Sequence, residues 1–252
     1  MVDRDAIERC GRLLREAGRV MATTGAGISA ESGVPTFRGP DGLWRRYRPE
    51  DLATPEAFGA NPALVWEWYR WRRARIAEAR PNPGHDALSR FERRWPAFEL
   101  VTQNVDGLHH RAGSTRVIEV HGNIWRTRCA RRCGFSIDES PGAATEPVPL
   151  DDRGLPVCQC GGMLRPDVTW FGEALDAQAI TRAFALAESC EVLLVVGTSS
   201  LVYPAAAVPE IALGAGATVI EINVDATPLT SRADVSLRGL AGEILPALEG
   251  AV

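Results

Sequence analysis

The segment GAGISAESGVPTFRG, residues 25–39, decides the fold of this chain. It follows a short apolar run, residues 20–23, so we expect a buried strand to end where the glycines begin. Gly25 and Gly27 carry no side chains, so backbone N–H groups at this turn can approach a pyrophosphate closely. The pattern G-x-G-x-x-A matches the fingerprint of dinucleotide-binding α/β proteins.

The residues after the glycine turn argue against a dehydrogenase. A dehydrogenase continues from the turn through a full helix into a second strand that ends in an acidic residue. Here residues 32–42, SGVPTFRGPDG, contain prolines and glycines that prevent a long helix. Glu50 and Asp51 lie at about the right distance, but no strand precedes them. We therefore expect a loop-covered dinucleotide site, suited to chemistry on the nicotinamide ribose.

The composition is that of an ordinary globular protein. The chain has 252 residues, enough for one large domain or two lobes, with 45% hydrophobic and 24% charged residues. A net charge of -4 gives no reason to expect nucleic-acid binding. The charged amino-terminal segment lacks an apolar signal region, and the longest apolar run, residues 192–196, is too short to cross a membrane. We expect a cytoplasmic protein with no nucleic-acid or membrane partner.

Strand and helix patterns alternate along most of the chain. Strands are expected over residues 19–23, 99–102, 117–120, 192–197 and 218–223, and helices over residues 5–17, 83–95, 177–189, 204–213 and 241–248. The alternation predicts an α/β fold with a Rossmann-like, mostly parallel sheet. Two stretches break it: residues 44–80 are rich in Trp and Arg and resemble helices with loops, and residues 128–165 are rich in cysteine and proline.

These two stretches are predicted to form a smaller lobe of the same domain. We expect one domain over residues 1–252, in which residues 1–43, 81–127 and 166–252 form the Rossmann-like lobe. The smaller lobe would consist of a helical part, residues 44–80, and a cysteine-containing part, residues 128–165. A cleft between the two lobes would receive cofactor and substrate.

Four of the six cysteines form a candidate metal site. Cys129, Cys133, Cys158 and Cys160 are spaced as C-x3-C and C-x-C. In a cytoplasmic protein such clustering favours a metal over disulfides, and four thiolates around zinc leave no open position for catalysis. We therefore expect one structural zinc ion rather than a metal-free cluster or a catalytic metal. Cys10 and Cys190 are interpreted as small core residues.

Two further segments carry residues suited to catalysis. One is TQNVDGLH, residues 102–109, and the other is the pair His121 and Gly122 after the apolar run 117–120. A histidine with an unperturbed pKa near 6.5 suits proton abstraction from a ribose hydroxyl at neutral pH. Together with the glycine segment they resemble the sirtuins, which are NAD-dependent protein deacylases, over nearly the whole chain.

The resemblance implies NAD as the cofactor and assigns roles to residues that match sirtuin motifs. In sirtuins the acyl oxygen of an acyl-lysine displaces nicotinamide from NAD, giving free lysine and 2′-O-acyl-ADP-ribose. His121, Asn104 and Asp106 would be catalytic, with His121 drawing a proton from the ribose diol. The residues implied to contact NAD are Gly25, Ala26, Gly27, Ile28, Glu31, Phe37, Arg38, Trp44, Gln103, Asn104, Val105, Asp106, Gly197, Thr198, Ser199, Asn223 and Ala241. Sirtuins usually carry C-x2-C twice, so the cysteine spacing departs from the family pattern.

The acylated substrate is implied to meet two other segments. VTWFGE, residues 168–173, resembles the segment that pairs with the substrate backbone, through Val168, Phe171 and Gly172; a buried hairpin edge is the alternative. Tyr69 and Arg72 lie three residues apart in a helix candidate, so they share one face.

A phenol and a guanidinium placed together would bind a carboxylate at the end of an acyl chain. They resemble the Tyr-x-x-Arg of class III sirtuins, which selects succinyl, malonyl or glutaryl lysine, and the small Ala53 fits the same class. The alternative is an exposed basic face.

The sequence thus predicts a monomeric NAD-dependent deacylase that removes succinyl and malonyl groups, and acetyl groups more weakly, from proteins or peptides. Three alternatives remain: a general deacetylase, a protein mono-ADP-ribosyltransferase, and a catalytically silent NAD-binding partner protein. The presence of His121, Asn104 and Asp106 argues against the last of these.

Overall fold

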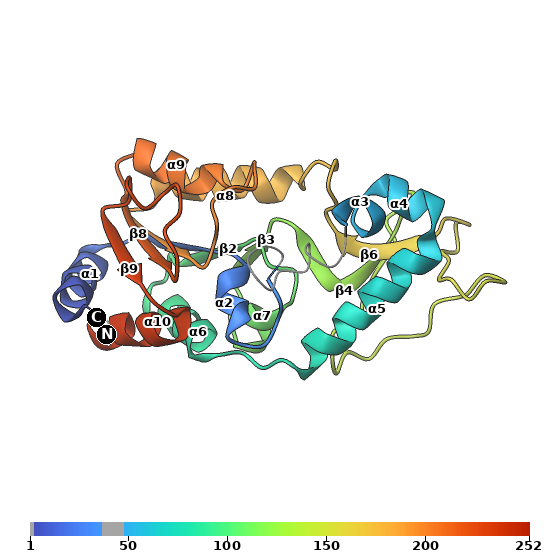
Figure 1. The fold of residues 1–252 in the computed structure, drawn as a ribbon, viewed down its shortest axis with the longest axis horizontal. Helices are drawn as coiled ribbons and strands as arrows, with labels where there is room; N and C mark the ends of the chain where they lie inside the picture. Colours follow the sequence, from blue (N-terminus) through green and yellow to red (C-terminus); the bar gives the residue numbers. More distant parts are fainter. Residues whose placement is uncertain (1–2, 37–47) are drawn as a thin grey trace.

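The computed structural model describes residues 3–36 and 48–252. It is elongated, with a large sheet and both chain termini at one end and a small sheet at the other (Figure 1). None of the helices in these described ranges is long and apolar enough to cross a bilayer.

The large sheet has six parallel strands in the order β3-β2-β1-β7-β8-β9. They are β1 (Val20–Thr24), β2 (Glu99–Thr102), β3 (Val117–Glu119), β7 (Val192–Val196), β8 (Thr218–Asn223) and β9 (Val235–Arg238). The two central strands, β1 and β7, are buried along their whole length, which explains their uninterrupted apolar sequences. The predicted Rossmann-like, mostly parallel sheet is confirmed. The strand order reverses between β1 and β7, and in such sheets ligands bind at the carboxyl ends of the strands beside this reversal.

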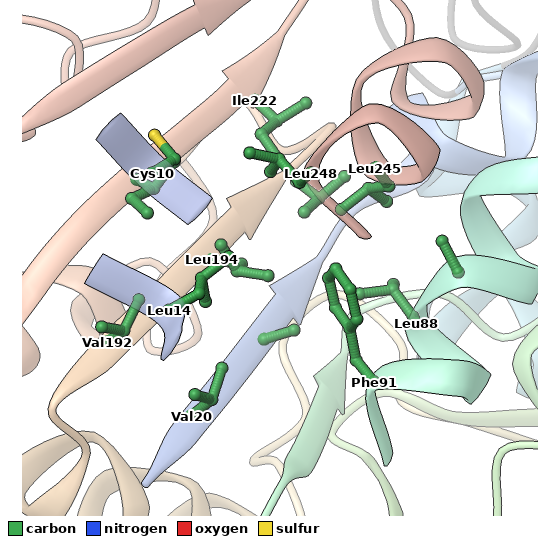
Figure 2. Close-up of a cluster of buried hydrophobic side chains, with 14 of the residues drawn as sticks. Cys10, Leu14, Val20, Leu88, Phe91, Val192, Leu194, Ile222, Leu245 and Leu248 are labelled. Atoms are coloured by element: carbon green, nitrogen blue, oxygen red, sulfur yellow. The ribbon is translucent and has the colours of Figure 1, made fainter. Parts of the chain in front are cut away.

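Helices cover both faces of the large sheet (Figure 1). One face carries α1 (Arg4–Glu16), α6 (Pro83–Arg94) and α10 (Ala241–Gly250), and the other carries α8 (Ala177–Ser189) and α9 (Ala207–Gly214). Figure 2 shows Leu14 of α1, Phe91 of α6 and Leu248 of α10 gathered over strand residues such as Leu194. Cys10 lies in the same cluster and Cys190 in the cluster on the opposite face, so both are core residues as expected. The core therefore holds the strand ends at fixed positions.

The small end of the molecule combines three helices with an antiparallel sheet. The helices are α3 (Pro49–Leu52), α4 (Pro55–Ala60) and α5 (Pro62–Glu78), and each begins with a proline, which suits the first helical position. The sheet has the order β5-β4-β6, formed by β5 (Ser136–Asp138), β4 (Gly122–Cys129) and β6 (Leu164–Val168). It includes residues on the large-lobe side of the predicted boundaries, and the division into lobes stays a prediction.

Helix α5 is fastened to this small sheet by side chains that reach main-chain carbonyls. Trp66 Nε1 donates to the carbonyl of Leu164 over 3.0 Å, and Arg73 Nε donates to the carbonyl of Ile124 over 2.7 Å. Arg73 also pairs with Glu139 just beyond β5, at 2.8 Å. The helix is thus held on β4 and β6 through main-chain carbonyls of both strands.

Candidate active site

The glycine turn joins β1 to the short helix α2 (Ala26–Ala30) and packs against the turn after β7. The N–H of Gly25 donates to the carbonyl of Val196, 3.0 Å away, and the N–H of Gly27 donates to that of Gly197, 2.8 Å away. A Cβ on Gly27 would lie 2.7 Å from Gly197 Cα. The glycines therefore permit close contact between two backbone turns. Because the N–H groups of Gly25 and Gly27 already donate to protein carbonyls, the prediction that backbone N–H groups of this turn approach a pyrophosphate concerns the other residues of the turn.

Side chains from three strand ends meet at Thr198. Gln103, after β2, donates from Nε2 to Thr198 Oγ1 over 3.0 Å, and Asn223, at the end of β8, donates from Nδ2 to the Thr198 carbonyl over 2.9 Å. Ser199 is exposed, whereas Ser200 Oγ is buried and lacks a hydrogen-bond partner among the described residues. A buried hydroxyl without a partner fits a site that binds a polar ligand. Amides and hydroxyls of this kind suit the ribose and phosphate groups of NAD.

Asn104 and Asp106 are buried beneath the glycine turn and share Ser29 as a partner. Ser29 Oγ donates to Asp106 Oδ2 over 2.8 Å, and Asn104 Nδ2 lies 3.2 Å from the same hydroxyl and 3.0 Å from the Gly25 carbonyl. The other Asp106 oxygen accepts the N–H of Leu108, at the start of α7 (Leu108–Arg111). Burial raises the pKa of Asp106 above its usual value, although these hydrogen bonds oppose the shift.

His121 lies between β3 and β4 with one ring nitrogen occupied. Its Nδ1 is 3.0 Å from the carbonyl oxygen of Gln103. A carbonyl can only accept, so the neutral ring carries its proton on Nδ1 and leaves Nε2 unprotonated. Burial lowers the pKa of His121 below 6.5, against the opposing effect of the Gln103 hydrogen bond. At neutral pH the residue is therefore a neutral imidazole with a free basic nitrogen.

The four clustered cysteines converge despite their unequal spacing. The sulfur atoms of Cys129, Cys133, Cys158 and Cys160 all lie within 4.8 Å of one another. In two pairs, Cys129 with Cys160 and Cys133 with Cys158, the sulfurs are 3.5 Å apart, far longer than the roughly 2.05 Å of a disulfide and close to the about 3.8 Å expected around tetrahedral zinc. The longer first spacing is accommodated by Arg132, whose φ of 53° lies in the left-handed region. The cluster therefore fits one structural zinc ion.

Tyr69 and Arg72 of α5 are both buried in the small end of the molecule, with 1% and 5% of their surfaces exposed. The exposed basic face considered as an alternative therefore does not describe Arg72. Its guanidinium carbon lies 4.9 Å from the Trp68 ring centroid and 5.8 Å from that of Tyr69. Burial lowers the pKa of Arg72 and raises that of Tyr69. The third predicted residue, Ala53, is also buried, and its carbonyl accepts the N–H of Phe171 over 2.9 Å.

A family model described as the Sir2 family matches residues 25–204, more than half of the chain. The chain belongs to the Sir2 family. It is 55% identical to "NAD-dependent protein deacylase 2" of Pyrobaculum aerophilum over 94% of this chain and 92% of the relative. It is 53% identical to "NAD-dependent protein deacylase" of Pyrococcus abyssi over 95% of each chain. The ADP-ribose complex of a Sir2 homologue variant superposes with a TM-score of 0.88 at 46% identity, over 97% of this chain and 95% of that one.

Most of the remaining residues expected to contact NAD in this Sir2 protein have side chains that are buried or bonded to the protein itself. Ala26 begins α2, but the side chain of Ile28 is fully buried in the main core, so only its backbone can face a ligand. Val105 is buried in the core of the small end. Glu31 accepts the N–H of Gly242 at the start of α10, beside the buried Ala241. Phe37, Arg38 and Trp44 lie outside the described residues.

The segment expected to bind the substrate backbone is partly exposed. Val168 ends β6 and is buried opposite Gly122, whereas Phe171 is 47% exposed and Gly172 adopts a φ of 83°. A cavity of about 470 Å³ lies between the two sheets, but it is lined by residues such as Glu119, Arg126 and Asp167 and by none of the predicted site residues.

Two residues of this Sir2 protein that were not predicted, Ser29 and Trp170, contact predicted site residues. Ser29 joins Asn104 to Asp106, and Trp170 Nε1 donates to the Tyr69 oxygen over 2.8 Å. Both lie inside segments quoted for other residues, residues 25–39 and 168–173. The available signals were a hydroxyl in a segment chosen for its glycines and an indole in a segment chosen for pairing with the substrate backbone.

Proposed function

We propose that this Sir2-family chain removes succinyl and malonyl groups, and acetyl groups less efficiently, from the lysine side chains of proteins. The chain is an NAD-dependent protein deacylase, the activity named for relatives that are 53–55% identical over more than nine tenths of its length. The relatives' names do not specify an acyl group, so the preference for acidic acyl groups is what is proposed here.

The observation that carries this preference is the buried pair of Tyr69 and Arg72. Burial penalises the charged form of Arg72, and Tyr69 and Asp106 both oppose that penalty. A planar guanidinium binds a carboxylate through two parallel hydrogen bonds. The raised pKa of Tyr69 keeps its phenol protonated and able to donate at neutral pH. An acyl chain that ends in a carboxylate could therefore accept hydrogen bonds from both groups.

His121 would act on the cofactor side of the same site. Bound NAD supplies the ribose carbon to which the acyl oxygen is transferred. The unprotonated Nε2 of His121 would take a proton from a ribose hydroxyl, with Gln103 holding the ring through its carbonyl. Asn104 and Asp106, fixed by Ser29, would hold polar groups of the cofactor. We further propose that the protein is monomeric and that it is cytoplasmic, a location that fits its unpaired cysteines.

The test is the acyl preference of Arg72→Met. The kcat/KM values for succinyl-lysine and acetyl-lysine peptides are measured with NAD for wild type, Arg72→Met and Arg75→Met, an exposed arginine on the same helix. Loss of a charge-assisted contact costs about 2 kcal/mol, so the ratio of succinyl to acetyl kcat/KM should fall at least tenfold in Arg72→Met alone.

Two results would contradict the proposal. An unchanged ratio in Arg72→Met would indicate a general deacetylase in which Arg72 is structural. Transfer of label from NAD to protein, without release of free lysine, would indicate a mono-ADP-ribosyltransferase.

A further inference from the structure

The indole of Trp170 is joined to the phenol of Tyr69 inside the small end of the molecule. Trp170 Nε1 donates to Tyr69 Oη over 2.8 Å, and the two ring centroids are 6.4 Å apart. Only 3% of Trp170 and 1% of Tyr69 is exposed. The bond spans segments 101 residues apart, connecting the loop after β6 with helix α5.

The direction of this hydrogen bond determines what the Tyr69 hydroxyl can do. An indole N–H only donates, and so does a guanidinium, whereas a phenol has one O–H donor and accepts through its oxygen. Trp170 and Arg72, which also interacts with the phenol, both offer donors to the Tyr69 oxygen. Neither can accept the Tyr69 hydrogen. The Tyr69 hydrogen is thereby left for an acceptor other than these two groups, and a carboxylate is a group that only accepts.

Trp170 is itself held firmly in place. The guanidinium carbon of Arg165 lies 3.2 Å from its ring centroid, and Phe58 packs against it with centroids 5.2 Å apart. The Glu173 carboxylate accepts from both terminal nitrogens of Arg165, at 2.6 and 2.9 Å, and from the main-chain N–H of Trp170, at 2.9 Å. Arg165 is 4% exposed, so this pairing is shielded from water. The indole N–H therefore has one orientation.

The same loop is fastened to the rest of the proposed acyl site. Phe171, the next residue, donates its N–H to the carbonyl of Ala53. The segment expected to bind the substrate backbone and the residues expected to bind the acyl group are therefore connected by two hydrogen bonds from consecutive residues. A substrate seated on this loop meets a Tyr69 whose hydroxyl is already oriented.

We propose that Trp170 is a positioning residue for acyl specificity, which orients the Tyr69 hydroxyl as a donor to the carboxylate of an acidic acyl chain. The inference rests on the proposed function, because it needs an acyl carboxylate as the acceptor. It extends that function to a residue that does not touch the substrate carboxylate. The orientation lowers the ordering cost of binding, so it acts on succinyl-lysine and not on acetyl-lysine.

The experiment uses Trp170→Phe, which removes the N–H and keeps an aromatic ring for Arg165 and Phe58. The kcat and KM values for succinyl- and acetyl-lysine peptides are measured for this variant, for Arg72→Met and Tyr69→Phe, and for the control Trp71→Phe. Trp71 lies on α5 with Tyr69 and Arg72 and is 37% exposed. We expect the succinyl-to-acetyl ratio of kcat/KM to fall about three- to tenfold in Trp170→Phe, mainly through the KM for the succinyl peptide. Trp71→Phe should keep the wild-type ratio.

A double variant separates positioning from a general packing defect. If Trp170 acts through the Tyr69 hydroxyl, adding Trp170→Phe to Tyr69→Phe changes the ratio no further. An additional fall in the ratio would overturn the inference. So would an unchanged ratio in Trp170→Phe when Arg72→Met lowers it, and the proposed function would then stand.

An unchanged ratio in Arg72→Met would reject the acidic-acyl preference and this inference together. If thermal melting shows that Trp170→Phe does not fold, the succinyl-to-acetyl ratio of kcat/KM in Tyr69→Phe tests the inference. A ratio as low as that of Arg72→Met supports the inference, and a wild-type ratio overturns it.

Discussion

His121 and Gln103 are connected by a hydrogen bond from the imidazole Nδ1 to the main-chain carbonyl, 3.0 Å long. This contact fixes the tautomer, and burial lowers the pKa of the ring below 6.5. The neutral form is the one that can accept a proton, and a lowered pKa extends its range toward acid. The geometry thus prepares His121 as a base over the whole neutral range.

The pH dependence of kcat/KM should report this shift. We expect a plateau above pH 7 and a one-proton decline at lower pH, with an apparent pKa below 6.5. His121→Ala should lower kcat at least about a hundredfold, the usual contribution of a general base. His110→Ala is the matched control, because His110 pairs with Glu119 and has no proposed role in the site. An apparent pKa above 7, or equal losses in both variants, would contradict the assignment.

Alanine should change stability in opposite directions at a glycine of the turn and at a glycine with open space around it. A Cβ on Gly27 would lie 2.7 Å from Gly197 Cα, whereas a Cβ on Gly59 in α4 would meet nothing within 4 Å. Gly27→Ala should lower the free energy of unfolding by about 1–3 kcal/mol through overpacking. Gly59→Ala should raise it by about 0.5–1 kcal/mol, because alanine has less backbone entropy to lose. Urea unfolding of both variants tests the pair, and equal shifts would mean that the turn can relax around a methyl group.

Five of the six strands of the large sheet could be predicted from sequence, most clearly the two central ones, whereas β9 was not expected. VMATT in β1 and VLLVV in β7 are short buried runs, separated from their neighbours by helical periodicities. The small sheet could not. β6 has the sequence LRPDV, in which a proline and an aspartate argue against a strand. The structure accommodates Asp167 by ion pairs with Arg126 and Arg128 of β4, at 3.1 and 3.0 Å, and these contacts leave no periodic pattern.

The site residues also divide into those that could be predicted from sequence and those that could not. Residues that share a motif, such as Asn104 and Asp106, could be grouped from sequence, and the structure places both beside Ser29. The contact between Trp170 and Tyr69 depends on how two distant segments pack, so no local spacing indicates it. The roles of Gly25 and Gly27 are ambiguous from sequence for a related reason. A glycine needed for close backbone packing has the same sequence signature as one needed for phosphate binding.

The cysteine cluster predicts a zinc ion that stabilises the small sheet. The purified chain should carry about one zinc, and Cys158→Ser should lose it together with several degrees of melting temperature. Cys190→Ser, a change in the core between α8 and the large sheet, should keep the zinc. Zinc content is measured by elemental analysis and stability by thermal melting. A zinc-free wild type that melts at the same temperature as the zinc-loaded protein would contradict a structural role.

Acid should destabilise the protein partly through His85. This histidine is fully buried at the start of α6, and its ring centroid lies 4.9 Å from that of His109. Burial lowers the pKa of His85 from 6.5 to about 4. As the pH falls below 6.5 the unfolded chain takes up the proton first, so stability decreases down to about pH 4. Between pH 7 and 4.5 the loss from this residue alone should be about 2 kcal/mol. His85→Gln lacks the titrating group, so its urea unfolding should be less sensitive to pH by that amount. A variant with the same pH dependence as wild type would show that the pKa of His85 is the same in the folded and unfolded states.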